Sequence, residues 1–310
     1  MRLKTATWIF LAFLTAGCVE RGEPKDGSQV STTTEYLRIG TWNVRNLFDT
    51  VCDSGHCEPG DYEPSVSAEA YKHKVESVVA GIKKINADVL MLQEIEKEDS
   101  IFDIQAELPE YKYYLFGETG RVASVDVAII SKFPITASKK YRDANPFTID
   151  GAEYLIAREL LHASVFTDSQ TQLEILTAHF ISHVSDDPGL RRTEEVRITS
   201  EILANVADNH KDALVIFGGD LNDEPGSSTL NRLDEESSLI NSRANSYKLN
   251  YYTCQRKYNL DHIYHNEPAK NALIDTEIIC DSSSYGFSTS DHCAVVALYG
   301  IVHETTVEKE

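Results

Sequence analysis

The stretch VIFGGDLNDEPGSS, residues 215–228, places polar side chains directly after a strand that is expected to be buried. The apolar run from Leu214 to Phe217 continues through two glycines to Asp220 and Asn222. Because side chains alternate along a strand, these last two residues are predicted to point to the same face just past the strand end. The glycines indicate a close backbone approach or a positive φ. An Asx turn would account for one of the two polar groups and leave the other without a role.

Apolar runs typical of strands occur on both sides of this stretch, along nearly the whole chain. They cover residues 36–44, 87–95, 111–117, 125–131, 154–166, 173–181, 213–221, 260–265, 273–279 and 293–302. Helical spacing occurs over 68–85 and 191–207, and a third, shorter helix is expected with Ser227 or Ser228 as its N-cap. Many strands with few helices favour one α/β domain in which two sheets pack together with helices outside.

Several other strand ends also carry polar side chains. Asn43 ends the first strand, Glu94 follows an apolar strand, and Asp261 lies inside another. An imidazole follows in LTAHFISH at His179, and the stretch STSDH, residues 288–292, ends in an Asp–His pair. Taken alone, such a pair also ends ordinary loops before buried strands.

A cluster of these carboxylates would raise its own pKa values by mutual repulsion unless a cation lay among them. The candidate ligands are oxygens, with few thiolates and with histidines at a spacing unlike that of zinc sites. This donor set points to Mg²⁺ or Mn²⁺, with Ca²⁺ as an additional candidate, rather than to Zn²⁺.

Seven motifs in a fixed order resemble those of the endonuclease/exonuclease/phosphatase superfamily, which has the deoxyribonuclease I-like fold. They are TWNVRNLFD, LMLQEIE, DVAIISKFPI, TAHFISH, GGDLNDEP, LDHIY and STSDH, and the resemblance covers roughly residues 36–302. Each motif is loose by itself, but all seven in one order are specific. The resemblance implies a four-layer α/β/β/α sandwich and a metal-dependent hydrolase acting on phosphoester bonds.

The resemblance also implies roles for individual residues. Glu94 is similar to the principal metal ligand of the family, with Asn43 and Asp291 helping to hold the ion or its waters. His292 matches the catalytic histidine of the family, and Asp261 matches its carboxylate partner. Whether this histidine transfers a proton or only donates to the phosphate stays open.

Five further positions match residues that act on the water or the phosphate. Asp220 and Asn222 match the pair that orients the attacking water and the scissile phosphate, and His179 matches a second active-site position that contacts phosphate. Arg158 falls near the phosphate-binding arginine of the family. Arg45 stands where the abasic-site repair branch has an acid, so it offers a phosphate contact in place of a second metal ligand. The implied reaction is hydrolysis by in-line attack of water.

The N-terminus resembles a bacterial lipoprotein signal. Arg2 and Lys4 precede the apolar run WIFLAFL, and LTAGC follows, ending at Cys18. We expect a signal peptide over 1–17, a flexible tether over 18–35, the catalytic domain over 36–303 and a polar tail over 304–310. An ordinary secretory signal is the alternative. Either kind of signal predicts export of the protein. A lipid on Cys18 would place it at the cell envelope, and an ordinary secretory signal would release it into the medium. We also expect a monomer.

Five cysteines remain after Cys18, and an oxidising compartment favours disulfides between them. The expected pairs are Cys52 with Cys57, and Cys254 with Cys280, which leaves Cys293 as a buried thiol. A metal site in CDSGHC is the alternative for the first pair, but no second Cys/His pair at ligand spacing follows.

The formal net charge of -20 constrains the substrate. Without Arg2 and Lys4 of the signal the charge becomes -22. Such a field repels polyanions, so an anionic substrate needs a local basic patch or a bound cation. A nuclease that binds nucleic acid weakly is the first hypothesis, with Arg191 and Arg192 placed to meet a backbone. A phospholipid or inositol phosphate phosphodiesterase or phosphatase is the second. The exposed aromatic hairpin that lipid-cleaving relatives need is not obvious in the sequence, where NYYT, residues 250–253, is at most a remnant of one. A non-catalytic surface binding module is the third.

Overall fold

The computed structural model describes residues 29–186, 189–243, 252–255, 257–281 and 286–307. One compact unit covers Thr34–Ile301. The other consists of residues 1–33 and 302–310, and its described residues belong to the first and last strands of the chain. None of the helices in the described ranges is both long and apolar enough to span a bilayer.

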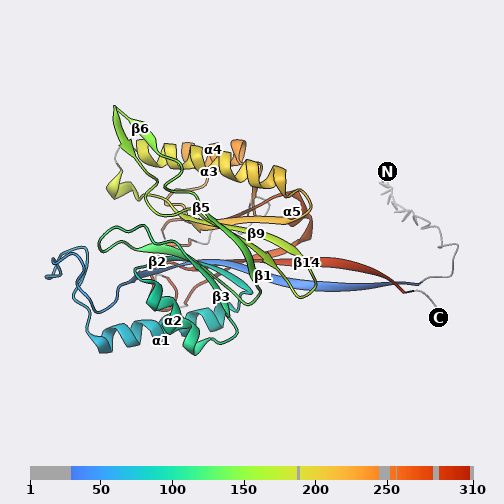
Figure 1. The fold of residues 1–310 in the computed structure, drawn as a ribbon, viewed down its shortest axis with the longest axis horizontal. Coiled ribbons are helices and arrows are strands. Elements are labelled where there is room, and N and C mark those ends of the chain that lie inside the picture. Colours follow the sequence, from blue (N-terminus) through green and yellow to red (C-terminus); the bar gives the residue numbers. More distant parts are fainter. Residues whose placement is uncertain (1–28, 187–188, 244–251, 256, 282–285, 308–310) are drawn as a thin grey trace, which may run out of the picture. The chain divides into compact units, whose positions relative to one another are not determined.

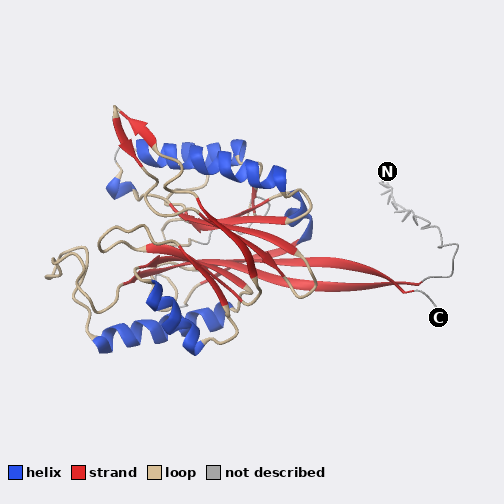
Figure 2. Cartoon of the chain, viewed as in Figure 1, coloured by secondary structure: helices blue, strands red, loops and turns tan. Residues whose placement is uncertain are grey.

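The compact unit contains two mixed six-stranded sheets (Figures 1 and 2). The first sheet has the order β13-β14-β1-β2-β4-β3 and the second β11-β12-β10-β9-β8-β5. The strands of the first sheet are β1 (Gln29–Leu47), β2 (Val89–Ile95), β3 (Tyr113–Phe116), β4 (Asp126–Ser131), β13 (Leu273–Ile279) and β14 (Ala294–Val307). The strands of the second are β5 (Ile135–Lys140), β8 (Leu161–Phe166), β9 (Gln172–His179), β10 (Leu214–Asp220), β11 (Ile240–Asn241) and β12 (Asp261–His265). A small hairpin joins β6 (Phe147–Ile149) to β7 (Ala152–Tyr154).

Helices cover the outer face of each sheet (Figure 1). Apolar residues of α1 (Ala68–Ile85) and α2 (Glu98–Glu107) pack on the first sheet, and those of α3 (Leu190–Asn209) and α4 (Ser228–Glu236) pack on the second. A third apolar cluster lies between the two sheets. The short helices η1 (His183–Ser185) and α5 (Glu267–Ala272) lie in connections. The predicted four-layer α/β/β/α sandwich is therefore confirmed.

The central strands are buried on both faces, which explains their continuous apolar sequences. Every residue of β10 and of β4 is buried, because each strand meets the other sheet on one face and helices on the opposite face. Helix α1 begins and ends where its spacing predicts, with the Ser67 hydroxyl accepting from the Ala70 amide and Asn86 in a left-handed conformation at its end. Ser227 is the N-cap of α4, so the first of the two serine candidates is the cap.

Some elements differ from the sequence prediction. The expected strand over 154–166 is divided into the end of β7 and β8, with an irregular loop over 155–160 between them. Helix α2 and the exposed strand β5 lack the apolar periodicity that would predict them. Residues 29–35 form the start of β1 where a tether is expected, and β14 continues to Val307 where a polar tail is expected from 304. The segment 1–28, with the expected signal and Cys18, lies outside the described residues.

The two glycines before Asp220 provide a close backbone approach rather than a positive φ. A Cβ atom on Gly219 would lie 1.9 Å from the carbonyl oxygen of Ala178 on β9. A Cβ atom on Gly218 would lie 2.7 Å from the Met91 side chain, which comes from the other sheet. The glycines therefore allow β10 to approach both its neighbour and the facing sheet just before it delivers Asp220.

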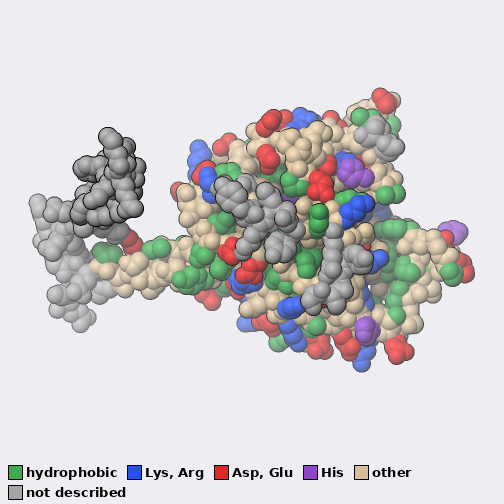
Figure 3. Space-filling view, turned by 180° about the vertical axis from the view of Figure 1, so that it is seen from behind, with side chains coloured by type: hydrophobic (Ala, Val, Ile, Leu, Met, Phe, Trp, Pro, Cys, Tyr) green, Lys and Arg blue, Asp and Glu red, His purple; other side chains and the backbone are tan. Residues whose placement is uncertain are grey.

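Charged side chains of both signs are interspersed on the molecular face shown in Figure 3. The net charge of -20 is therefore not collected into one acidic patch on that face. A local basic site remains compatible with the acidic total.

The disulfides correct one of the two predicted pairs. Cys52 is bonded to Cys57, as expected, but Cys280 is bonded to Cys293, and Cys254 is a buried free thiol. The reason is strand pairing: β13 and β14 are antiparallel and Ile279 pairs with Ala294, so the next residue outward on each strand is a cysteine. Cys254 instead forms an isolated β-bridge with His292.

We expect Cys254→Ser to keep both disulfides. Cys280→Ser should leave Cys293 as a free thiol and lower the free energy of unfolding by about 3 kcal/mol, because the disulfide closes a loop of 13 residues. Peptide mapping by mass spectrometry without reduction, together with urea unfolding, measures both effects. Loss of a disulfide in Cys254→Ser would contradict the pairing.

Candidate active site

Three polar residues lie in one row across adjacent strands of the second sheet. Asp220, the last residue of β10, pairs with His179 of β9 on one side and with Asp261 of β12 on the other. All three side chains are at least nine-tenths buried. A strand register therefore fixes which carboxylates and which imidazole meet, although the three residues are far apart in the sequence.

The first sheet contributes Asn43 and Glu94, which are placed by irregular backbone. Asn43 of β1 pairs with Gln93 of β2, and the register of both strands shifts immediately afterwards. Glu94 has φ 67°, and Arg45 and Asn46 have φ 60° and 45°. Such left-handed conformations are strained for residues other than glycine, and they cluster at functional sites. The bulge turns Glu94 out of the regular alternation of β2.

Asn43 ties the two sheets together at this point. Its Nδ2 donates to Glu94 Oε1 at 2.8 Å and to Asp220 Oδ2 at 2.9 Å, and its Oδ1 accepts from the Arg45 amide at 2.9 Å. Glu94 Oε2 accepts from the Asn46 amide at 2.8 Å. The amide of Asn43 thus holds one carboxylate from each sheet at a fixed separation.

His292 is held by a buried carboxylate. Its Nδ1 lies 2.8 Å from Asp261 Oδ2, and its Nε2 lies 3.8 Å from Asp220 Oδ2. The Ser290 hydroxyl accepts from the His292 amide at 3.0 Å and donates to the Asn43 carbonyl at 2.6 Å. Burial alone would lower the pKa of His292, but the charges of Asp261 and Asp220 outweigh it and raise the pKa well above its usual value. The two carboxylates therefore favour the protonated form of His292.

His179 has the opposite electrostatic environment. Its Nε2 lies 3.4 Å from Asp220 Oδ2 and 4.0 Å from Glu94 Oε1, and its Nδ1 is buried without a hydrogen-bond partner among the described residues. Burial, followed by the nearby charges of Arg158 and His292, lowers the pKa of His179 well below its usual value. The pKa values of the two imidazoles around the same aspartate are thus shifted in opposite directions.

The carboxylates suit a divalent cation. Glu94, His179 and Asp220 offer ligand atoms that lie within 4.8 Å of one another, and Asp220, Asp261 and His292 form a second such group. Burial raises the pKa of Asp220, and the charges of Asp261 and Glu94 act in the same direction. Buried oxygens that repel one another are the donor set that Mg²⁺ or Mn²⁺ neutralises. The residues present therefore fit the expected cation.

Asp291 and Asn222 are placed differently from the other predicted residues. Asp291 belongs to neither carboxylate group, and its oxygens lie 3.6 Å from Arg45 Nε and 3.0 Å from Gln255 Nε2. Asn222 has φ 50°, so the strand alternation predicted from Asp220 ends before it. Its Nδ2 donates to the Phe180 carbonyl and its amide to Asp220 Oδ1, both at 3.0 Å. Asn222 holds the strand ends together in this structure.

Two arginines that the sequence places side by side on α3 have different surroundings. Arg192 is buried, lies 3.3 Å from Asp223 and donates to the Ile181 carbonyl, so it is not available to meet a backbone as expected. Arg191 lines a cavity together with Arg158. Helical periodicity separates the two side chains by about 100° around the helix axis. The sequence alone does not show which of them faces the site.

The sequence did not predict a role for Glu195, which binds the backbone of two loops that carry site residues. Its carboxylate accepts from the Ala157 amide at 2.6 Å and from the Ile181 amide at 2.9 Å. Ala157 directly precedes Arg158, and Ile181 is two residues after His179. Burial raises the pKa of Glu195 to about 7 against the lowering effect of these two amides. In the sequence, Glu195 is one of several acids in a charged helical stretch. Nothing in the sequence distinguishes it from a neighbouring glutamate that is exposed to solvent.

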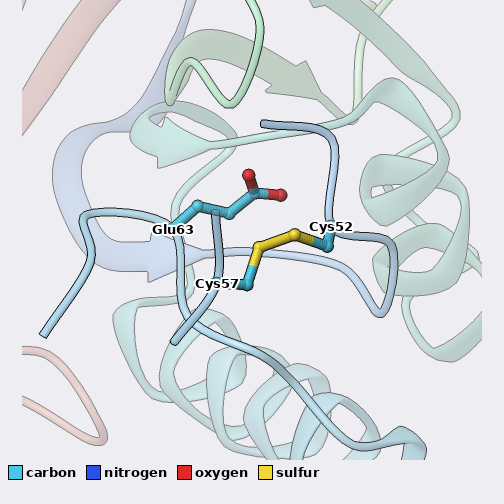
Figure 4. A group of neighbouring side chains, drawn as sticks. All are labelled: Cys52, Cys57 and Glu63. Carbon is cyan, nitrogen blue, oxygen red and sulfur yellow. A yellow bond between two sulfur atoms is a disulfide. The ribbon is translucent and has the colours of Figure 1, made fainter. Parts of the chain in front are cut away.

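The loop CDSGHC is not a metal site. Figure 4 shows Glu63 alongside the disulfide of Cys52 and Cys57, so the sulfurs are not thiolate ligands. Both oxygens of Glu63 are occupied, accepting from the amides of Asp53 and Ser54 at 2.7 Å each. The loop is held by the disulfide and by one carboxylate.

Comparisons with known proteins identify the family and the fold of the chain. The model of the Endonuclease/Exonuclease/phosphatase family matches residues 40–292. Among curated proteins, none matches the chain. Similar solved structures include D. rerio TDP2 complexed with single strand DNA product, with a TM-score of 0.60, 19% identity, and 86% of this chain and 99% of that chain covered.

Two other similar structures come from different sources. A family protein from Bacteroides thetaiotaomicron has a TM-score of 0.60 and 15% identity, with 86% of this chain and 98% of that chain covered. The human nocturnin catalytic domain with a bound sulfate anion has a TM-score of 0.60 and 16% identity, with 90% of this chain and 98% of that chain covered. At these identities the likeness establishes the fold.

We expect Glu195 to make the free energy of unfolding fall as pH rises from about 4.5 to about 7. Over this window the folded protein retains a proton that the unfolded chain has lost, because burial raises the pKa of Glu195 from 4.5 to about 7. Glu195→Gln removes the titration, so its slope should be flatter by up to about 1.4 kcal/mol per pH unit. Urea unfolding in EDTA at pH 5, 6 and 7 measures the slopes.

Glu194→Gln is the matched control, because Glu194 lies one position earlier and pairs with Arg197 at 2.8 Å, away from the two loops. Its slope should follow the wild type. Parallel slopes for wild type and Glu195→Gln would refute the assignment.

Proposed function

The chain belongs to the Endonuclease/Exonuclease/phosphatase family, whose members are hydrolases of phosphoester bonds, and we propose that it is a metal-dependent nuclease that cleaves DNA or RNA. The observation that carries the proposal is the convergence of two imidazoles, from His179 and His292, on the Asp220 carboxylate, at 3.4 Å and 3.8 Å. This arrangement places two hydrogen-bonding rings at a single carboxylate that is also tied to Glu94 through Asn43.

Glu94 and Asp220 are the residues that would hold Mg²⁺ or Mn²⁺, with Asn43 and Asp291 assisting and Ca²⁺ as an additional candidate. When bound, the cation supplies Lewis-acid polarisation of a phosphoryl oxygen and stabilises charge on the leaving oxygen. The convergence of buried carboxylates from both sheets supports this assignment.

The protein residues bind and orient the phosphate and the water. His292, fixed through Nδ1 by Asp261, presents Nε2 as a donor to a phosphate oxygen or to the leaving oxygen. Asp220, between the imidazoles, orients the attacking water. His179 contacts the phosphate, and its lowered pKa favours the uncharged ring in that role. Because the carboxylate row is preformed, little reorganisation is needed at the moment of reaction.

Nucleic acid is the favoured substrate class. The TDP2 structure that resembles this chain is complexed with single strand DNA product, which supports a polynucleotide substrate. A phospholipid or inositol phosphate substrate is the alternative, but its expected membrane contact, residues 250–253, lies partly outside the described residues. A non-catalytic binding module is disfavoured, because every position that the family motifs assign is filled.

We also propose export by the first 17 residues, with a lipid on Cys18 as the anchor, and a monomeric state. The basic residues at the N-terminus, the apolar run after them and the small residues before Cys18 support this export signal.

The substrate hypotheses predict different outcomes in one assay. Supercoiled plasmid, single-stranded RNA, sphingomyelin and inositol phosphates are offered in parallel, each with Mg²⁺ and with EDTA. We expect Mg²⁺-dependent cleavage of plasmid or RNA and no cleavage in EDTA. Release from sphingomyelin or inositol phosphate alone would overturn the nuclease assignment, and no turnover of any substrate would favour the binding module.

Glu94→Gln and His292→Ala should each lower the rate of phosphodiester cleavage by about 10²–10⁴-fold, because one removes the principal ligand and the other the proton donor. His73→Ala is the control, since His73 lies exposed on α1 and contributes to no part of the site. Wild-type rates in either site variant would refute the assigned roles.

Binding of DNA should be weak, with a shallow dependence on salt. Few arginines face the site of a chain with charge -20, so we expect the logarithm of the affinity to fall against the logarithm of salt concentration with a slope of roughly -3 or shallower. Fluorescence polarisation of labelled DNA with His292→Ala measures it. Retention on a DNA column at high salt would contradict this expectation.

A further inference from the structure

A cavity of about 270 Å³ lies next to the carboxylate cluster and is lined by three arginines. Arg121 comes from the loop before β4, Arg158 from the loop between β7 and β8, and Arg191 from the first turn of α3. Hydroxyl groups of Tyr62, Ser124 and Ser185 also lie on its wall. Separate parts of the chain thus bring positive charge and hydrogen-bond donors to one hollow.

None of these three arginines forms an ion pair within the described part of the chain. Most other described arginines have a carboxylate within 4.0 Å. They are Arg38, Arg45, Arg142, Arg192, Arg197 and Arg232. Carboxylates are abundant in a chain with charge -20, yet these three guanidinium groups around one cavity lack a carboxylate partner among the described residues. Their described hydrogen bonds go to neutral groups, from Arg191 to the Leu155 carbonyl and from Arg158 to the Tyr62 hydroxyl.

The cluster carries an electrostatic cost that an anion would relieve. Burial and then the charges of Arg142, Arg191 and Arg158 lower the pKa of Arg121. The Nε of Arg191 is buried without a hydrogen-bond partner among the described residues, while its guanidinium lies 5.0 Å from the centre of the Tyr154 ring. Arginine stays charged under all ordinary conditions, so the three guanidinium groups keep positive charge around the cavity, where an anion would be attracted.

The cavity is close to the reacting centre. The charge of Arg158 acts on both His179 and the Tyr62 hydroxyl, and Glu94 also acts on that hydroxyl. Ile181, on the cavity wall, is two residues after His179. A ligand with a phosphate at the carboxylate cluster therefore has this basic cavity beside it for a second anionic group.

We propose that Arg121 and Arg191, together with Arg158, form a subsite for a second phosphate of the substrate, next to the phosphate that is cleaved. The inference rests on the proposed function and specifies its substrate as a molecule with at least two phosphates. Guanidinium groups match phosphate oxygens through paired N–H donors, and this makes arginine the preferred residue for such recognition. The second phosphate comes either from the next linkage of a strand or from a terminal monoester.

Three chromogenic substrates separate these sources. Thymidine 5′-(p-nitrophenyl phosphate) carries one phosphate, its 3′-phosphorylated form adds a monoester, and its 3′-extension by one nucleotide adds a diester. With Mg²⁺, we expect KM to be at least about tenfold lower for a substrate with the second phosphate, the effect of one good charged contact. The form that gains more identifies the source of the phosphate.

Arg121→Gln and Arg191→Gln should each remove most of this advantage by raising KM for the two-phosphate substrates, with Lys substitutions restoring part of it through charge alone. Arg197→Gln is the matched control, because Arg197 lies on the same helix as Arg191 and is paired with Glu194 and Glu201 at 2.8 Å and 2.7 Å. It should retain the wild-type ratio. Thermal melting checks that every variant is folded.

A binding measurement distinguishes failure of the subsite from failure of the function. Calorimetry compares thymidine 3′,5′-bisphosphate with thymidine 5′-phosphate on the same proteins. Tighter binding of the bisphosphate that is lost in Arg121→Gln supports the subsite even if no substrate is hydrolysed, a result that would refute only the nuclease assignment. Hydrolysis of all three substrates with equal KM, together with equal binding of the two nucleotides, would overturn the subsite.

Discussion

The alignment of three strand ends is the constraint on which the rest of the site depends. Because β9, β10 and β12 pair in one register, His179, Asp220 and Asp261 meet in a single row at the end of the second sheet. A slip of one residue in β10 would turn Asp220 to the opposite face and separate both imidazoles from their shared carboxylate. The close approach at Gly218 and Gly219 holds this register, since any side chain there would collide with the neighbouring backbone or the facing sheet. The chemistry of the site is thus a consequence of sheet geometry.

The same row explains how the pKa values of two neighbouring histidines shift in opposite directions. His292 has a carboxylate of its own in Asp261, which raises its pKa, whereas burial and the charge of Arg158 lower the pKa of His179. Neither shift follows from the residue type, whose ordinary pKa lies near neutral pH. Each follows from the burial of the ring and the charge beside it. Asp220 lies 3.4 Å and 3.8 Å from the two rings, so a change in the charge of either histidine alters the electrostatic environment of the other.

Much of the fold could be predicted from the sequence, because strands covered on both faces are continuously apolar and α1 carries clear periodicity and caps. The site residues could be named from ordered motifs, but their arrangement could not. The bulge that turns Glu94 depends on its two neighbouring strands, and a positive φ at Asn222 ends the alternation on which its predicted orientation depended. The disulfide of Cys280 was missed because strand partners, rather than spacing, decide which cysteines meet. Glu195 acts through backbone amides, which leave no signature in the sequence.

The bond between Cys280 and Cys293 has a consequence for when the site matures. Cys293 immediately follows His292, so the backbone that carries this histidine is covalently attached to the neighbouring strand only after the two thiols are oxidised. Without this bond the same backbone is held by noncovalent contacts, among them the Ser290 hydroxyl, the bridge to Cys254 and the indole of Trp42, which donates to the His292 carbonyl. Oxidation of the two thiols therefore adds a covalent restraint directly beside His292.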